Sequence, residues 1–234
     1  MCKAVVFDLD GCLVDSEPLS LEATAAEMRA VGIEDATAAS VGAEFLGVTV
    51  AVVCERVAQR TGRPCPPDFQ SRIEARLFRA YAEGLALIPG ARALVEHLAE
   101  AGVPMAIATG GSRARMAKTL EFAGLSDFFR GRGFSAEQVV RGKPAPDLFL
   151  FAAEALGVDP AHCLVVEDSP HGIKGGAAAG MTVFGFTGGA HLEGRREAHA
   201  ATLAAAGATA VFDDMSLLAQ ALLKRLDIDR ERNG

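Results

Sequence analysis

Short apolar runs alternate with longer amphipathic stretches along most of the chain. Five runs have almost no polar position and predict buried strands: Ala4–Phe7, Met105–Ala108, Cys163–Val166, Met181–Phe186 and Ala208–Phe212. Four stretches carry apolar residues at the i, i+3, i+4 spacing of a helix: Ala91–Ala101, Arg113–Ala123, Asp147–Leu156 and Ser216–Leu226. Strands without polar alternation, separated by helices, are typical of a parallel sheet covered on both faces. The pattern therefore predicts an α/β fold with a doubly wound parallel sheet.

The stretch between Glu17 and Glu83 breaks this alternation, because it contains no convincing strand. Amphipathic helices are predicted over Leu19–Val31, Val48–Arg60 and Asp68–Ala82. The turn sequence Ile88-Pro89-Gly90 marks the return to the α/β pattern. We therefore predict a helical domain, residues 17–86, inserted into an α/β domain made of residues 1–16 and 87–234. Such an insert would lie above the carboxyl end of the first strand, where α/β folds bind ligands.

Composition narrows the class of protein. The 234 residues are 50% hydrophobic and 23% charged, which is enough to bury the core of one domain carrying an insert. A net charge of −7 disfavours binding to nucleic acid phosphates over a broad surface. No apolar run approaches the roughly 18 residues of a membrane span, and the N-terminal residues lack the pattern of a signal peptide. Five cysteines without a C-x-x-C pair predict free thiols. We expect a cytoplasmic protein with no nucleic-acid or membrane partner.

Acidic side chains follow two of the predicted strands. Asp8 and Asp10 end the first strand and, two residues apart, project to the same side of the chain. Glu167 and Asp168 end the strand that begins at Cys163. If these strands are neighbours, the carboxylates converge, and two like charges ~4 Å apart repel by about 4 kcal/mol at an effective dielectric constant near 20. Such a set of oxygen ligands favours Mg²⁺. The alternative is a solvated acidic rim.

Groups that suit a phosphate lie between the two acidic pairs. Thr109 and Gly110 follow a predicted strand and lead through Gly111 to Ser112, where a helix begins. Free N–H groups and the positive end of that helix favour an anion, although a plain glycine turn with Ser112 as N-cap explains the same residues. Lys143 precedes another predicted helix and would neutralise both the carboxylates and a phosphate. Taken alone, it would be an ordinary surface lysine.

Other catalytic motifs are absent from the sequence. There is no G-x-x-x-x-G-K-[ST] phosphate loop, and Ala114 stands where a serine nucleophile elbow needs its last glycine. Gly131-Arg132-Gly133 lacks the third glycine of a dinucleotide-binding loop. The histidines form no H-E-x-x-H motif, so each is expected at the surface or behind the ligands of a metal.

Four motifs, in their order and their placement at strand ends, resemble those of the haloacid dehalogenase superfamily. They are Asp8-Leu9-Asp10-Gly11-Cys12-Leu13-Val14-Asp15-Ser16-Glu17, Thr109, Lys143 and Glu167-Asp168-Ser169. The resemblance covers essentially the whole chain and implies a Rossmann-like core. The insert resembles the helical cap of the phosphatase and β-phosphoglucomutase-like branch. Cys12 replaces the usual threonine, and we expect this change to affect loop packing and not the chemistry.

The resemblance implies a phosphoryl transfer in which Asp8 becomes an aspartyl-phosphate and Asp10 acts first as an acid and then as a base. A dehalogenase has no leaving alkoxide to protonate, so Asp10 favours phosphoryl transfer over dehalogenation. The groups that would hold the phosphoryl oxygens are Thr109, Gly110 and Lys143. The implied ligands of Mg²⁺ are Asp8, the carbonyl of Asp10, Asp168 and, as a further ligand or an outer partner, Glu167.

We expect a phosphatase for a small phosphorylated metabolite, either a sugar phosphate or a phosphorylated sugar acid. A mutase is the alternative, and a non-enzymatic phosphometabolite sensor is a third. Mutases carry an arginine after a cap Gly-Val-Ser, where Gly47-Val48-Thr49 is followed here by Val50, and their cap histidine would fall near Ser20. The candidate substrate contacts in the cap are Glu17, Thr49, Arg72 and Arg76, although the two arginines equally suit a solvated basic face. We expect a monomer or a weak homodimer.

Overall fold

The computed structural model describes residues 2–45 and 50–228. The chain divides into two compact units: Met1–Asp15 with Ala86–Gly234, and Ser16–Leu85. We call the first the α/β unit and the second the helical unit. Both divisions lie one residue before the domain boundaries predicted from the sequence.

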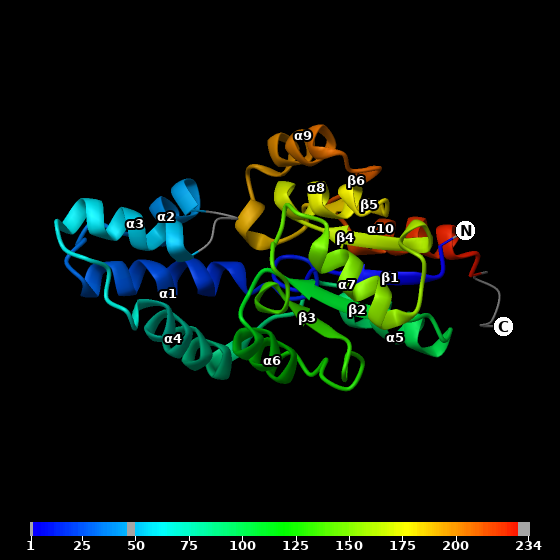
Figure 1. Ribbon diagram of the computed structural model, residues 1–234, viewed down its shortest axis with the longest axis horizontal. Coiled ribbons are helices and arrows are strands. Elements are labelled where there is room, and N and C mark those ends of the chain that lie inside the picture. Colours follow the sequence, from blue (N-terminus) through cyan, green and yellow to red (C-terminus); the bar gives the residue numbers. More distant parts are fainter. Residues whose placement is uncertain (1, 46–49, 229–234) are drawn as a thin grey trace. The chain divides into compact units, whose positions relative to one another are not determined.

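The α/β unit contains a six-stranded parallel sheet in the order β3-β2-β1-β4-β5-β6 (Figure 1). Its strands are β1 (Ala4–Phe7), β2 (Met105–Thr109), β3 (Gly133–Ser135), β4 (Cys163–Glu167), β5 (Thr182–Phe186) and β6 (Ala210–Phe212). The strand order reverses its direction between β1 and β4, which makes the sheet doubly wound, as the apolar pattern predicts. In such sheets, ligands bind at the carboxyl ends of the strands beside this reversal.

Helices cover the sheet because its strands are apolar on both faces. Ala4 and Val6 of β1 pack with Val165 of β4 in a buried cluster that also contains residues of α7, α8 and α9. Val5 and Phe7 alternate with them and face the other side, where the ring of Phe7 meets the edge of Phe129. The helices of this unit are α5 (Ala91–Glu100), α6 (Arg113–Phe122), α7 (Asp147–Leu156), α8 (Pro170–Ala178), α9 (Arg196–Ala206) and α10 (Met215–Leu226).

The helical unit has its own apolar core. Its helices are α1 (Glu17–Ala30), α2 (Ala38–Phe45), α3 (Val50–Thr61) and α4 (Phe69–Gly84). The three predicted helices correspond to α1, α3 and α4, whereas α2 was not predicted. Phe69, Leu77 and Tyr81 of α4 lie in the centre of the core with Met28 of α1 and Val57 of α3.

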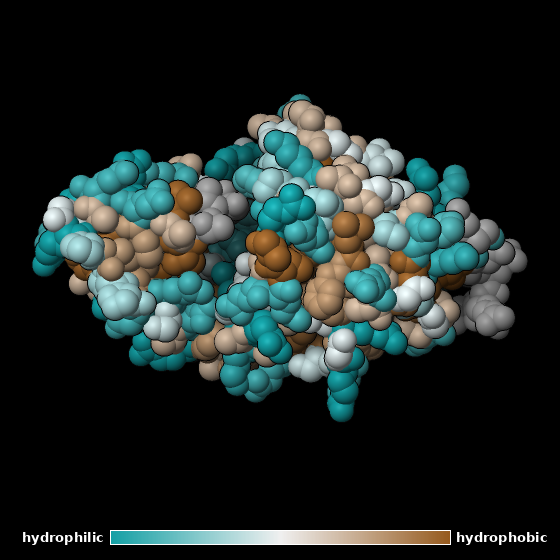
Figure 2. Space-filling model, in the orientation of Figure 1, coloured by the Kyte–Doolittle hydropathy of each residue, from teal (hydrophilic) through white to brown (hydrophobic). Residues whose placement is uncertain are grey.

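No single helix among the described residues is long and apolar enough to span a membrane. The pair α2 and α3 meets those length and composition criteria only when taken together, and the two helices are bent by 115° at their break. Their apolar residues Val41, Phe45, Val53 and Val57 are buried in the core of the helical unit. The face of the molecule shown in Figure 2 is largely hydrophilic, with small separate apolar spots of the kind that most protein surfaces carry.

Candidate active site

The two acidic strand ends lie side by side. β1 and β4 are hydrogen-bonded neighbours, with Phe7 opposite Val166, and the N–H of Asp8 donates to the carbonyl of Val166 at 2.9 Å. Asp8 therefore comes out of the sheet next to Glu167. The side chains of both residues are almost fully buried. The convergence that the sequence predicted for neighbouring strands is thus present for these two carboxylates.

Lys143 joins these two carboxylates from the loop that precedes α7. Its Nζ donates to Asp8 Oδ1 at 2.5 Å and to Glu167 Oε2 at 2.8 Å. The Lys143 side chain is only 9% exposed, so solvent screens these contacts weakly. Its Nζ also lies 5.3 Å from the centre of the Phe149 ring. The predicted lysine is therefore not a surface residue, and it lies where an anion bound beside Asp8 would meet its charge.

Burial and mutual repulsion shift the ionisation of this cluster. Burial raises the pKa of Asp8 well above its ordinary value, and Glu167 raises it further, whereas Lys143 opposes both effects. Burial likewise raises the pKa of Glu167. Burial alone would lower the pKa of Lys143, but the contacts with Asp8 and Glu167 raise it above its ordinary value. One buried cation therefore offsets the carboxylates only in part, and the site favours a further positive charge.

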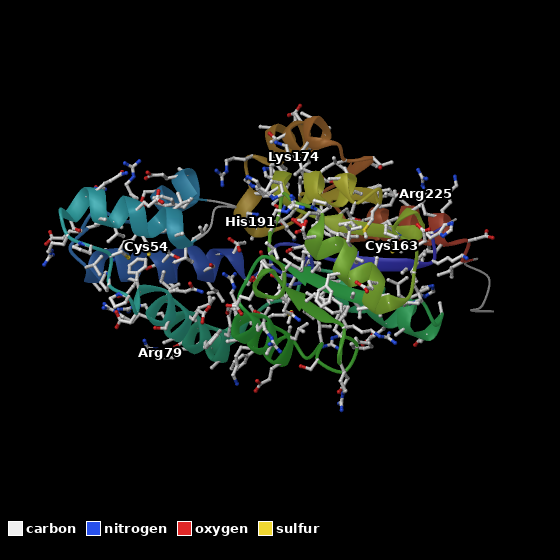
Figure 3. All side chains as sticks on the ribbon, in the orientation of Figure 1. Cys54, Arg79, Cys163, Lys174, His191 and Arg225 are labelled. Carbon is white, nitrogen blue, oxygen red and sulfur yellow. The ribbon has the colours of Figure 1, made fainter. Side chains whose placement is uncertain are left out.

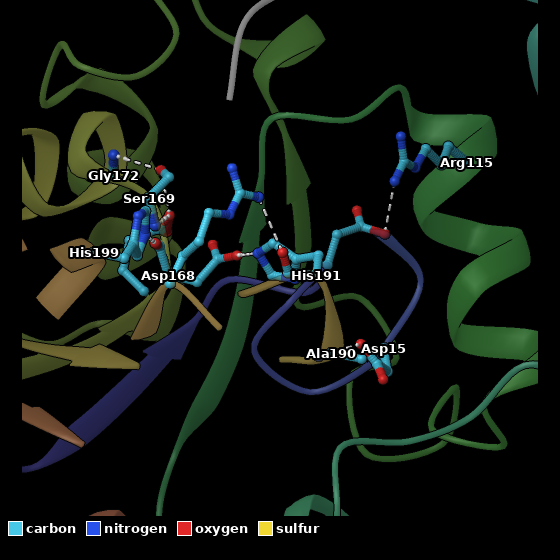
Figure 4. A network of polar contacts seen from close by, with 11 residues as sticks. Asp15, Arg115, Asp168, Ser169, Gly172, Ala190, His191 and His199 are labelled. Atoms are coloured by element: carbon cyan, nitrogen blue, oxygen red, sulfur yellow. Dashed lines mark hydrogen bonds and ion pairs between the residues drawn. The ribbon is translucent and has the colours of Figure 1, made fainter. Parts of the chain in front are cut away.

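Asp168 lies beside Asp8 and contacts two histidines (Figure 4). Nε2 of His199, on α9, lies 2.6 Å from the backbone carbonyl of Asp168. Nε2 of His191 lies 3.4 Å from Asp168 Oδ2, and His191 sits on the short 3-10 helix η3 (Ala190–Leu192) (Figure 3). Asp15 accepts a hydrogen bond from the N–H of Ala190, which ties η3 to the loop after β1.

Two glycines let the backbone approach these carboxylates. Gly11 has a φ of +81°, and a Cβ there would lie 2.1 Å from Asp168 Oδ2, so a side chain at this turn would be strained and would displace Asp168. A Cβ on Gly172, in the first turn of α8, would lie 2.0 Å from Cδ of Glu167. Glu167 instead accepts a 2.8 Å hydrogen bond from the hydroxyl of Ser169, the N-cap of α8.

The predicted phosphate loop follows β2, the other neighbour of β1. Thr109 is buried, and its Oγ1 accepts a 3.1 Å hydrogen bond from the N–H of Gly111. The carbonyl of Gly111 accepts a 2.6 Å bond from Ser135 at the end of β3. Ser112 caps α6 through a bond from the N–H of Arg115. Gly110 is exposed at the turn, and a Cβ there would meet no atom within 4 Å.

Asp10 forms an ion pair with Arg115, which lies on α6 (Figure 4), and the distance between Asp10 Oδ1 and Arg115 Nη2 is 2.9 Å. The sequence did not identify Arg115, nor did it single out His191 and His199. Arg115 lies three residues after the loop serine Ser112, which places it in the first turn of a helix beside the site. This position at the start of a helix was the one feature of the sequence that could have pointed to Arg115. His191 lies on η3, after β5, and His199 lies on α9, and no sequence motif links either residue to Asp168.

A divalent cation fits the acidic cluster. One carboxylate oxygen each of Asp8 and Asp168 and the Sγ of Cys12 all lie within 4.8 Å of one another. Burial raises the pKa of Cys12 well above its ordinary value, and Asp168 raises it further, so this thiol stays protonated at neutral pH. The carboxylate oxygens of Asp8 and Asp168 are then the metal donors of this group, and hard oxygen ligands suit Mg²⁺.

The candidate substrate residues predicted for the helical unit are Glu17, Thr49, Arg72 and Arg76. Glu17 is the first residue of α1. Arg72 and Arg76, on α4, both form ion pairs with Glu27 of α1, the second through a 2.8 Å contact between Nε and Oε2. Glu27 is buried, so a structural role as its partners accounts for both arginines without a substrate. Thr49 lies outside the described residues.

The fold and the site define an α/β enzyme with buried carboxylates at the switch point of its sheet. Over residues 2–180 the chain matches the haloacid dehalogenase-like hydrolase family. The chain therefore belongs to the haloacid dehalogenase-like hydrolases, as its four motifs indicate.

Named relatives agree with this assignment. The chain is 37% identical over 186 residues to hexitol phosphatase A of Escherichia coli (strain K12), covering 78% of this chain and 82% of that protein. It is 30% identical over 190 residues to 6-phosphogluconate phosphatase of the same strain, covering 81% and 84%. A crystal structure of a HAD family hydrolase from Deinococcus radiodurans R1, with bound phosphate and sodium, is 35% identical, with a TM-score of 0.75 and 96% of each chain covered.

Proposed function

We propose that the protein is a Mg²⁺-dependent phosphatase that hydrolyses a small phosphorylated metabolite through an aspartyl-phosphate. The main support is the position of Asp8: it is buried beside Glu167 and Asp168, bound by Lys143, and placed at the carboxyl edge of the sheet. The relatives named hexitol phosphatase A and 6-phosphogluconate phosphatase support a sugar phosphate or a phosphorylated sugar acid as the substrate.

In the first half of the reaction, a carboxylate oxygen of Asp8 attacks the phosphorus atom while the bond from phosphorus to the leaving oxygen breaks. Asp10 donates its proton to that oxygen, so the product leaves as a neutral alcohol. Lys143 and the Thr109–Gly110 turn hold the remaining phosphoryl oxygens, because an ammonium group and backbone N–H groups both stabilise their charge.

In the second half, water releases the phosphate. Asp10, now ionised, accepts a proton from water as the water oxygen attacks the phosphorus atom. The bond between phosphorus and the Asp8 oxygen breaks, inorganic phosphate leaves, and Asp8 is again a carboxylate. Asp10 ends the cycle protonated, so the same two aspartates are ready for another substrate.

Asp8, Asp168 and the carbonyl of Asp10 would hold Mg²⁺, and Glu167 would act through its bond to Lys143 or as a further ligand. The ion, when bound, offsets the repulsion between an anionic nucleophile and an anionic phosphate. The helical unit would supply the residues that distinguish one leaving group from another.

Phosphate release from a panel of sugar phosphates and phosphorylated sugar acids, with and without Mg²⁺, tests this function. Asp8→Asn is expected to lower kcat by about 10⁴-fold or more, since it removes the nucleophile. Intact-mass measurement of rapidly quenched wild-type enzyme should detect a phosphate adduct that Asp8→Asn lacks. Asp213→Asn is the matched control, because Asp213 follows β6 at the same edge of the sheet but is exposed.

The same panel separates the alternatives. A mutase would convert its substrate into an isomeric sugar phosphate and would depend on a bisphosphate activator. A sensor would bind phosphate or a metabolite without releasing product. Activity that survives Asp8→Asn would refute the role of Asp8 as nucleophile.

A further inference from the structure

Arg115 links the phosphate loop to Asp10. Its Nη2 lies 2.9 Å from Asp10 Oδ1, across 105 positions of sequence. The two side chains are only 19% and 12% exposed, so neither moves freely in solvent. A charged hydrogen bond between partly buried groups fixes the orientation of a carboxylate better than a solvent-exposed ion pair does.

The start of α6 directs Arg115 to this place. The hydroxyl of Ser112 accepts a 3.0 Å hydrogen bond from the N–H of Arg115, which fixes the first turn of the helix. Cδ of Arg115 lies 3.4 Å from where a Cβ on Gly111 would be, so its aliphatic stem passes over this glycine. Gly111 is itself bonded to Thr109. The turn that is proposed to hold a phosphate therefore also directs the guanidinium to Asp10.

We propose that Arg115 is a positioning residue that holds the Asp10 carboxyl where it meets the leaving oxygen of the substrate. This role rests on the proposed function, in which Asp10 protonates that oxygen. Proton transfer requires hydrogen-bond geometry, so an Asp10 side chain that is free to rotate gives its proton less often. An alkyl phosphate needs this proton, because its leaving alkoxide is strongly basic. An aryl phosphate with a stable phenolate leaving group does not. Arg115 thus determines how well the enzyme hydrolyses unactivated phosphate esters.

Steady-state kinetics with two substrates tests this role. The alkyl phosphate is glycerol phosphate or the best sugar phosphate of the panel, and the aryl phosphate is p-nitrophenyl phosphate. In Arg115→Met, kcat/KM is expected to fall by about 10²-fold for the alkyl phosphate and by less than about threefold for the aryl phosphate. The ratio kcat/KM is used because it reports only the steps up to departure of the leaving group. Inhibition by inorganic phosphate should be unchanged. Arg115→Lys, which keeps the charge, should recover part of the activity on the alkyl phosphate.

Arg113→Met is the matched control, because Arg113 is exposed on the same turn of α6. Thermal melting shows whether each variant is folded, and Arg115→Lys provides the same comparison if Arg115→Met is not. Asp10→Asn should show the same preference for the aryl phosphate, and the double variant Asp10→Asn/Arg115→Met should lose no further activity on the alkyl phosphate.

Three results would overturn this inference. An equal loss on both substrates with weaker phosphate inhibition would make Arg115 a phosphate-binding residue. If Arg115→Met had unchanged kinetics while Asp10→Asn preferred the aryl phosphate, Arg115 would have no role in the reaction, and the proposed function would stand. An Asp10→Asn enzyme without leaving-group selectivity would refute the acid role of Asp10, and the role of Arg115 with it.

Discussion

Asp8 is the residue whose ionisation decides whether the site can react. Burial raises its pKa well above the ordinary value, and Glu167 adds to this effect. Only the ionised carboxylate attacks phosphorus, so activity is expected to fall as the pH drops through that raised pKa. A divalent cation binds the ionised form. A higher Mg²⁺ concentration should therefore move the acidic limb of the pH profile, the range in which activity falls, to lower pH. Profiles of kcat/KM against pH at two Mg²⁺ concentrations measure the shift.

The direction of that shift is the test. If the pH range of the acidic limb did not change with Mg²⁺ concentration, the ion would not bind beside the group whose protonation lowers activity. A limb that moved to higher pH would contradict competition between the cation and a proton for the same oxygens. Asp213→Asn, which leaves the cluster intact, should give the same shift as the wild-type protein.

At the scale of elements, five of the six strands (β1, β2, β4, β5 and β6) were predicted because each lies in a short run with almost no polar position. β1 matches its prediction, whereas β3 was missed because Phe134, its one large apolar residue, stands between Gly133 and Ser135 and forms no apolar run. The helix α8 was not predicted because Gly172, Gly175 and Gly176 dilute its pattern. At Gly172 the cause lies in the site, since a Cβ would overlap Glu167. A local hydrophobic pattern cannot show that a position must be glycine because a side chain of another element, here Glu167 of β4, fills the space.

The candidate site shows the same limit. Asp8, Lys143 and Glu167 are identifiable from the sequence, because each follows or precedes an element at a place where a ligand would bind. That Lys143 bonds to both carboxylates, and that Arg115 reaches Asp10, depends on which strands are neighbours and on how far each side chain extends. Spacing along the chain contains neither kind of information.

The contact between α1 and α4 gives a prediction for the helical unit. Glu27 is 1% exposed, whereas its partners Arg72 and Arg76 are 39% and 38% exposed. The double variant Arg72→Met/Arg76→Met leaves a buried carboxylate without these partners and is expected to cost about 3–5 kcal/mol of unfolding free energy. Glu27→Met leaves two arginines that reach water, and it should cost no more than about 1 kcal/mol.

Urea denaturation followed by circular dichroism compares the two variants. Equal costs, or a larger cost for Glu27→Met, would show that the ion pair does not stabilise the unit in this way. Phosphatase assays on the single variants Arg72→Met and Arg76→Met test whether either arginine also binds substrate. If Arg72 or Arg76 binds an anionic part of the substrate, KM will rise for that substrate alone while stability changes little.

At the scale of the whole molecule, the contacts described above for the candidate site join residues of the α/β unit. Asp8 and Asp10 come from its first segment, and Lys143, Glu167 and Asp168 from its second. The carboxyl edge of the sheet thus unites two stretches of chain that the helical unit separates in sequence. A cation shared by Asp8 and Asp168 would connect these two stretches directly.

Mg²⁺ is therefore expected to stabilise the folded protein. A ligand at 100 times its Kd that binds only the folded state stabilises it by about 2.7 kcal/mol. For a protein of this size, about 2–4 °C of Tm corresponds to each kcal/mol, so Tm should rise by roughly 5–10 °C. Differential scanning calorimetry with MgCl₂, against NaCl at equal ionic strength, measures the rise. Asp168→Asn should lose most of it, because the ion then lacks a charged ligand, whereas Asp213→Asn should keep it. A rise that persisted in Asp168→Asn would place the ion elsewhere on the protein.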